Sequence, residues 1–289
     1  MKPETIDLSK LFQTEASQSP GTKEYLELKA VFGAQMSEIY GANGLCQADF
    51  TEIGSIKLPF YQMGAISSVD LFGLDELLIF SFYVKQRFRY RKVCDIGANI
   101  GLHSIVMSKL GFSVDSFEPD PRHQDRFTTN LKINECHDVS LYNKAVSDVD
   151  GEHEFVRVEG NTTGSHLAGS KPEPYGDLTT FTVPTVAFKA IISDYDFIKI
   201  DAEGAEATLL CGTTNHDWLN TDAMVEVGSK LNATRIFEHF YEQRIPIYSQ
   251  KTNWARVRNI VDMPFSYKDG SIFISKNLRG PWDYSHETE

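Results

Sequence analysis

One stretch constrains the fold of this chain more than any other: a short apolar run that ends in an acid and a glycine-containing turn. It reads Val93-Cys94-Asp95-Ile96-Gly97-Ala98-Asn99-Ile100-Gly101 and leads into an amphipathic run from Leu102 to Leu110. A second apolar run, Phe112 to Phe117, is closed by Glu118. A buried strand that passes into a helix in an α/β sheet has this pattern. The two runs therefore predict two strands of such a sheet.

The spacing of the two acids indicates a nucleoside-containing ligand. Asp95 and Glu118 lie 23 residues apart (118 − 95), close to the span at which a nucleotide-binding unit places a carboxylate on a ribose. The dinucleotide fingerprint, however, has a glycine where this chain has Asn99, and that glycine lets the backbone approach a pyrophosphate. An acid-led loop suits a ligand with ribose hydroxyls and a cation instead. S-adenosylmethionine (SAM), an adenosine that carries a sulfonium and an ammonium, fits this description.

Charge and hydropathy limit the partners. The 289 residues carry a formal net charge of −12, which argues against the basic surface that nucleic acid requires. The polar first 21 residues lack a signal-peptide core, and the longest apolar run, Leu77 to Val84, is too short to span a bilayer. We therefore expect a soluble cytoplasmic protein that binds no nucleic acid. The sequence leaves the oligomeric state open, and a homo-oligomer is one option.

The chain divides by pattern into three parts. Residues 1–90 predict an N-terminal cap: a tail, a helix over 23–40, a hairpin within 50–63 and a helix over 68–88. Residues 91–280 alternate strands and helices, which predicts a doubly wound, mainly parallel sheet, and residues 281–289 are a C-terminal tail. Strands are expected at 92–96, 113–118, 139–143, 196–201, 222–227 and 271–275, and helices near 101–110, 121–133, 203–210 and 230–243. The segment 151–184 interrupts this alternation and predicts a long functional or mobile loop, with a lid over 161–175.

Ligands of doubly wound sheets bind beyond the carboxyl ends of the strands, and several polar residues stand at such ends. The glycines of the first loop would let the backbone approach a cofactor, and the neighbouring amide would contact it. Glu118 is expected to accept hydrogen bonds from the ribose hydroxyls. The strand-end rule places adenine at the third strand and the methionyl end at the acidic run that begins at residue 201. The cofactor-binding candidates are Asp95, Gly97, Asn99, Gly101, Glu118, Asn143, Lys144 and Asp201.

Several of these motifs, taken together and in order, resemble the FkbM family of SAM-dependent methyltransferases. They are Asp95-Ile-Gly-Ala-Asn-Ile-Gly101, Phe117-Glu-Pro-Asp120, Asn130 and Asn134, Ala145-Val146 and Ile198-Lys-Ile-Asp-Ala-Glu-Gly-Ala-Glu206. The resemblance covers about residues 70–230. It implies a Rossmann-like class I methyltransferase fold, with a seven-stranded sheet whose last strand, Ser271 to Ser275, runs antiparallel. It also implies O-methylation of a sugar or polyketide hydroxyl, and thus a small-molecule or glycan acceptor.

The chain departs from the family pattern where a catalytic base would be expected. Ala187-Phe188 replaces a Leu-Asp pair, and Gly228 stands where a histidine commonly follows the glutamate. A sugar hydroxyl is a very weak acid, so a base must act as the new bond forms. His166 is the preferred candidate because an unperturbed imidazole titrates near neutrality, and Glu203 and Glu226 are the competing carboxylates. No histidine or acid spacing indicates a metal site.

Two other functions remain open on the sequence. A nicotinamide-dependent oxidoreductase can use a similar sheet, although the missing middle glycine and the second acid cluster oppose it. A non-catalytic SAM-binding scaffold is the second alternative, because the positions at Ala187-Phe188 and Gly228 are altered.

Overall fold

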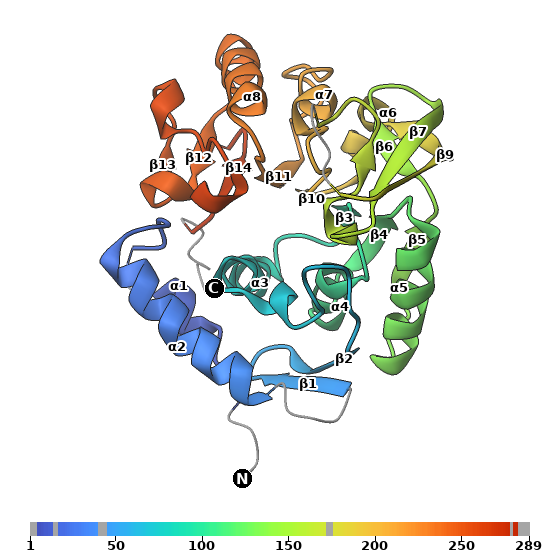
Figure 1. Ribbon diagram of the computed structural model, residues 1–289. Coiled ribbons are helices and arrows are strands. Elements are labelled where there is room, and N and C mark those ends of the chain that lie inside the picture. The colour runs from blue at the N-terminus through green and yellow to red at the C-terminus, as the bar shows by residue number, and fades with distance from the viewer. Residues whose placement is uncertain (1–4, 14–16, 40–44, 172–175, 278–279, 283–289) are drawn as a thin grey trace.

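The computed structural model describes residues 5–13, 17–39, 45–171, 176–277 and 280–282. Its main sheet has the strand order β13-β12-β14-β11-β10-β3-β4-β5 (Figure 1). Strands β11, β10, β3, β4 and β5 run parallel, and β14 is antiparallel to β11, as predicted. The strands are β3 (Lys92–Ile96), β4 (Ser113–Phe117), β5 (Val139–Tyr142), β10 (Phe197–Ile200), β11 (Asp222–Glu226), β12 (Ile247–Ser249), β13 (Ala255–Arg256) and β14 (Ser271–Ile274). The two-residue β13 at one edge is an addition to the seven strands expected.

Helices cover both faces of this sheet, and its central strands are therefore buried on both sides. Along β10, Phe197 joins the core that includes α3 and α4, whereas Ile198 and Ile200 join the core that includes α7 and α8. This alternation follows the two-residue period of a strand. The doubly wound α/β class is therefore confirmed. The helices are α3 (Leu74–Gln86), α4 (Leu102–Lys109), α5 (Pro121–Ile133), α6 (Phe188–Ile191), α7 (Glu206–Leu210) and α8 (Lys230–Gln243).

The N-terminal segment folds against the first of these cores. It contains α1 (Ser9–Gln13) and α2 (Lys23–Ile39), which lie to the left of α3 in Figure 1, and the hairpin of β1 (Leu45–Phe50) and β2 (Gly54–Pro59), which lies below α3 and α4. Leu8 and Leu11, within the expected tail, are fully buried in the same core as Val93 and Phe112. The division of the chain near residue 90 stays a prediction, and side chains on its two sides share one core.

The helix expected from Ser68 begins later, at Leu74, after a short 3-10 turn at Asp70–Phe72. The Ser68 hydroxyl donates to the carbonyl of Pro59 (3.0 Å) and accepts the N–H of Tyr61 (3.1 Å). Ser68 therefore fixes the loop after β2 and does not cap the helix.

The segment expected to be a long loop forms most of a second, smaller sheet. Its strands are β6 (Ala145–Ser147), β7 (Gly151–Val158), β8 (His166–Leu167) and β9 (Leu178–Ala187), in the order β6-β9-β7-β8. The long pairing of β7 with β9 supplies the backbone hydrogen bonds that the sequence pattern concealed. Of the expected lid, 161–171 belongs to this hairpin region, and 172–175 lies outside the described residues.

In the part of the chain that the structure describes, no helix combines the length and the apolar character needed to cross a membrane.

Candidate functional site

The glycine loop after β3 adopts backbone conformations that depend on its sequence. Gly97 (φ +75°), Asn99 (φ +52°) and Gly101 (φ +88°) all occupy the left-handed region. A Cβ on Gly97 would lie 1.8 Å from the carbonyl oxygen of Asp201, and one on Gly101 would lie 2.7 Å from the ring of Phe127. Only glycine fits such close approaches. The loop therefore lies tightly against the end of β10.

Glu118, directly after β4, faces this loop. Its Oε2 accepts the backbone N–H of Asn99 (2.8 Å) and its Oε1 accepts the N–H of Asp120 (2.7 Å). The residue is only 4% exposed, and burial raises the pKa of its carboxyl to about 8. Each carboxylate oxygen keeps a lone pair for a further donor. The structure thus brings together the two motifs whose spacing suggested a ribose site.

Asp95 lies beneath the loop at the end of β3. Its Oδ2 accepts the hydroxyl of Ser104 (2.6 Å), and its Oδ1 lies 4.0 Å from the Nζ of Lys199. Asp95 Oδ1 and Asn99 Oδ1 are both buried, and neither has a hydrogen-bond partner in the described parts of the chain. Buried acceptors of this kind are normally satisfied. The pair suits a ligand that carries hydrogen-bond donors or a positive charge.

A buried lysine links the acids at the ends of β3 and β10. Lys199 Nζ lies 3.2 Å from Asp201 Oδ2, directly after β10. Burial opposes the charged amine, but Asp201 and Asp95 raise its pKa above the usual value. Lys199 therefore remains a cation beside both carboxylates.

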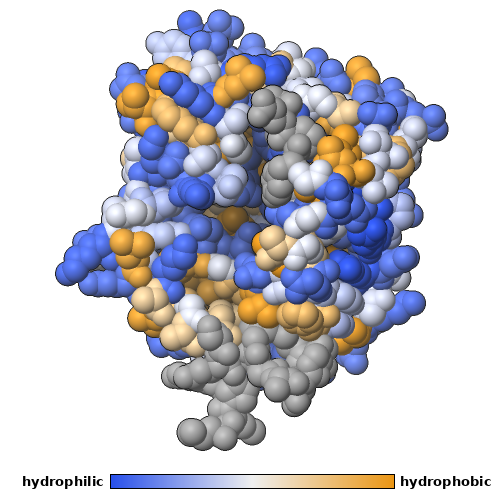
Figure 2. Space-filling view, in the orientation of Figure 1, coloured by the Kyte–Doolittle hydropathy of each residue, from blue (hydrophilic) through white to orange (hydrophobic). Residues whose placement is uncertain are grey.

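A pocket opens beside this lysine, between α3 and the ends of β10 and β11. It is lined by Glu76, Lys199, Asp201, Glu226 and Ser271, among others. Figure 2 shows a hollow near the centre of this face, with both hydrophilic and hydrophobic residues around it. Burial, followed by the charges of Asp201 and Glu76, raises the pKa of Glu226 well above its usual range. No other described side chain or backbone group forms a hydrogen bond with the Glu226 carboxylate.

Sequence reasoning missed Glu76. His103 Nε2 lies 2.7 Å from Glu76 Oε2, and Tyr83 Oη lies 2.9 Å from His103 Nδ1. Tyr83 and His103 thus fix the position of Oε2 of Glu76, and the Glu76 side chain lines the pocket. Tyr83 is fully buried in α3, which orients the imidazole of α4. The only sequence signal was an acid in the first turn of a helix, where acids are common for other reasons.

The other predicted site residues lie in three different surroundings. His166 is buried in β8 with Nδ1 3.0 Å from the carbonyl of Gly164, and burial lowers the pKa of its imidazole. It does not line the pocket that Glu226 lines. Glu203 accepts a hydrogen bond from Lys171, and burial raises the pKa of its carboxyl. Asn143 and Lys144 are exposed directly after β5, at the same edge of the sheet.

The residues fit SAM as a cofactor. The glycine cradle, the Glu118 carboxylate and the unmet oxygens of Asp95 and Asn99 offer acceptors for ribose hydroxyls and for an ammonium group. For metals the result differs: within the described ranges, no group of three or more histidine, cysteine or acidic residues could hold an ion.

Comparison with known proteins gives a family match. Residues 95–245, more than half of the chain, match the model of the methyltransferase FkbM domain. Among solved structures, the chain is similar to an O-methyltransferase from Bacillus cereus in complex with SAH (12% identity, 68% of this chain and 80% of that one, TM-score 0.38). It is also similar to a SAM-dependent methyltransferase from Agrobacterium tumefaciens (8%, 81% and 70%, TM-score 0.40) and to an rRNA methylase from Streptococcus thermophilus (10%, 69% and 94%, TM-score 0.38). Comparison with curated proteins gave no match.

Proposed function

This chain belongs to the FkbM family of methyltransferases and uses S-adenosylmethionine, and we propose that it methylates a hydroxyl group of a sugar, glycan or small-molecule natural product. The family membership decides against a nicotinamide-dependent oxidoreductase. The net charge of −12 supports such an acceptor over a nucleic acid.

The observation that carries the hydroxyl proposal is the Glu226 carboxylate. It lines the pocket beside Asp201 and has no hydrogen-bond partner of its own in the described structure. An amine acceptor can lose its proton to water before it reacts, but a hydroxyl must lose its proton as the bond forms. A carboxylate with a raised pKa is a stronger base than an ordinary glutamate. Glu226 is therefore our candidate for the general base, in place of the preferred His166.

Bound SAM supplies a methyl group that its sulfonium already activates. The residues of the chain then have three tasks. Glu118 accepts hydrogen bonds from the ribose hydroxyls. The Asp95 and Asp201 carboxylates attract the positively charged groups of SAM, and Glu226 takes the proton from the acceptor hydroxyl. The Lys199 cation partly offsets the repulsion among the neighbouring acids, so that Glu226 can act in its ionised form.

The acceptor class is tested with methyl-labelled SAM and a panel of glycosides, polyketide alcohols, amines, carboxylic acids and RNA. We expect label in an alkali-stable ether on a hydroxylated compound. Label only in an amine, a carboxyl ester or RNA would reject the hydroxyl proposal. SAM binding with no transfer to any class, in the presence of intact Glu226, would instead favour the non-catalytic scaffold.

We further expect the affinity for an adenosine ligand to increase with pH. Glu118, with its pKa raised to about 8, is mostly protonated below that pH in the free protein, whereas ribose hydroxyls need the ionised carboxylate as acceptor. Binding therefore releases a proton, and the affinity should rise about tenfold per pH unit below pH 8 and level off above it. 5′-Methylthioadenosine is the suitable probe in titration calorimetry, because it has no amino acid group that titrates in this range.

Glu118→Gln is the matched variant for this measurement. It keeps the size of the side chain but removes the charge, so binding at pH 9 should weaken by about 1.5–3 kcal/mol, the scale of a hydrogen bond to a charged group. The pH dependence should disappear with it. A Glu118→Gln protein that retains both affinity and pH dependence would show that the ribose lies elsewhere.

A further inference from the structure

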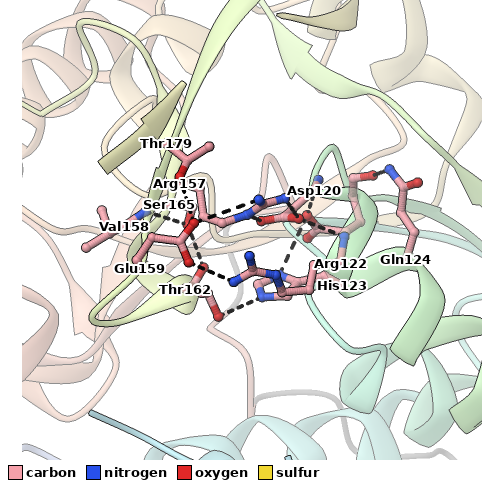
Figure 3. A network of polar contacts seen from close by, with 11 residues as sticks. Asp120, Arg122, His123, Gln124, Arg157, Val158, Glu159, Thr162, Ser165 and Thr179 are labelled. Carbon is pink, nitrogen blue, oxygen red and sulfur yellow. Dashed lines mark hydrogen bonds and ion pairs between the residues drawn. The ribbon is translucent and has the colours of Figure 1, made fainter. Parts of the chain in front are cut away.

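A buried ion pair joins the small sheet to the turn that carries Glu118. Arg157 of β7 donates from Nε to Asp120 Oδ2 (2.7 Å) and from Nη2 to Asp120 Oδ1 (2.5 Å), as Figure 3 shows. Asp120 is 0% exposed. Two parallel bonds fix the plane of the guanidinium as well as its distance, which a single ammonium contact does not. The geometry of this pair is therefore tightly defined.

Asp120 passes this constraint on to Glu118 through its own backbone. Its N–H donates to Glu118 Oε1, while its side chain accepts the N–H of Arg122 (2.8 Å) as the N-cap of α5. Asp120 is thus held by the helix on one side and by Arg157 on the other. Without the cation, its carboxylate would be a buried charge with a single donor, a costly arrangement that favours rearrangement of the turn.

Other contacts also run between α5 and the segment that begins with β7. His123 Nε2 lies 3.0 Å from Thr162 Oγ1, and Arg122 Nη1 donates to Glu159 Oε2 (2.8 Å) (Figure 3). Arg157 also lies 4.7 Å above the ring of Phe181 in β9. Of these contacts in the described part of the chain, the Arg157 ion pair reaches the residue whose N–H holds Glu118, while His123 Nδ1 lies 3.8 Å from Glu118 Oε1 without a hydrogen bond.

We propose that Arg157 is a positioning residue for the cofactor: through Asp120 it holds the Glu118 carboxylate in the place where it meets the ribose hydroxyls. Arg157 itself need not touch the ligand. The inference rests on the proposed SAM site and deepens it, because it makes cofactor binding depend on a sheet that lies outside the Rossmann-like core. It also gives the small sheet a role beyond the fold.

The test compares two ligands and three variants by titration calorimetry. The ligands are 5′-methylthioadenosine and its 2′,3′-dideoxy analogue, which lacks the groups that Glu118 would bind. Arg157→Gln should weaken binding of the first about tenfold or more but change binding of the second by less than about threefold. Arg157→Lys, which keeps the charge but not the fork, should fall between Arg157→Gln and the unmodified protein. Arg122→Gln, which removes the neighbouring ion pair with Glu159, should change neither affinity by more than about twofold.

The difference between the two ligands separates positioning from general stability. Equal losses for both ligands in Arg157→Gln, or no loss for either, would overturn the inference. If Arg157→Gln does not fold, Arg157→Lys decides the matter by the same criterion. Failure of the unmodified protein to bind 5′-methylthioadenosine would reject the SAM site itself. A loss of hydroxyl discrimination in Glu118→Gln but in neither Arg157 variant would reject the Arg157 role alone.

Discussion

Gly97→Ala is expected to destabilise the protein by about 3–5 kcal/mol and to abolish detectable SAM binding. The added Cβ would stand 1.8 Å from the Asp201 carbonyl oxygen, and the backbone is left-handed at φ +75°. Left-handed strain costs about 1–3 kcal/mol, and overpacking adds a similar amount. Gly97 directly follows β3 and Asp201 directly follows β10. Relieving the clash therefore requires the end of β3 to move away from the end of β10, which displaces the glycine loop proposed to hold the cofactor. Chemical denaturation and calorimetry with SAM measure the two effects.

Gly111→Ala is the matched control. Gly111 has a similar backbone (φ +91°) after α4, but a Cβ there would meet nothing within 4 Å. Gly111→Ala should cost only the left-handed strain, the same roughly 1–3 kcal/mol, and leave SAM affinity unchanged. Equal stabilities for the two variants would contradict the close approach of the loop to Asp201.

Glu226→Gln is expected to lower kcat about 10²- to 10⁴-fold, the usual contribution of a general base, once the panel has identified an acceptor. SAM affinity should stay within about twofold of the unmodified protein. Since the base acts only when ionised, kcat should fall as the pH drops below the raised pKa of Glu226. In Glu226→Gln, kcat should not show this decrease at low pH. Labelled methyl transfer across a pH series measures both.

Two further variants test the assignment of Glu226 as the general base. Glu242→Gln changes an exposed acid on α8 and controls for loss of charge. His166→Gln tests the base that the sequence favoured. A larger loss of kcat in His166→Gln than in Glu226→Gln, with SAM affinity retained, would return the role to the histidine.

The proximity of the proposed cofactor residues could be predicted because each stands at the end of a strand in the same half of the sheet. Asp95, the glycines and Glu118 are each tied to the end of a strand, and parallel strands bring their carboxyl ends to one edge. The main strands could be found for the same reason: Val93, Ile198 and Val225 lie in short apolar runs with clear boundaries.

The acceptor side could be predicted only in part: Glu226 stands at the end of an expected strand and was a candidate base, whereas Glu76 was not found. Glu76 and Glu226 are 150 residues apart (226 − 76) and line one pocket because α3 lies beside the ends of β10 and β11. The small sheet could not be predicted from the sequence for a related reason. β8 has only two residues, and β9 lies beyond a polar stretch, so its pairing with β7 depends on contacts that no local pattern reveals. Likewise, His166 lies in a segment predicted as a loop, whereas the structure places it in β8 and buries it.

Part of the pocket wall comes from stretches that the family match does not include, while Lys199, Asp201 and Glu226 come from within it. Glu76 precedes residues 95–245, and Ser271 follows them, whereas the glycine loop, Glu118 and Asp201 lie within. On the proposed mechanism, the matched region carries the methyl donor and the base, and the flanking stretches shape the space for the acceptor. Substitutions around residues 75–79 and 267–271 could therefore change the compound that is methylated and leave the donor site intact. Two proteins with closely similar matched regions can thus modify chemically different compounds.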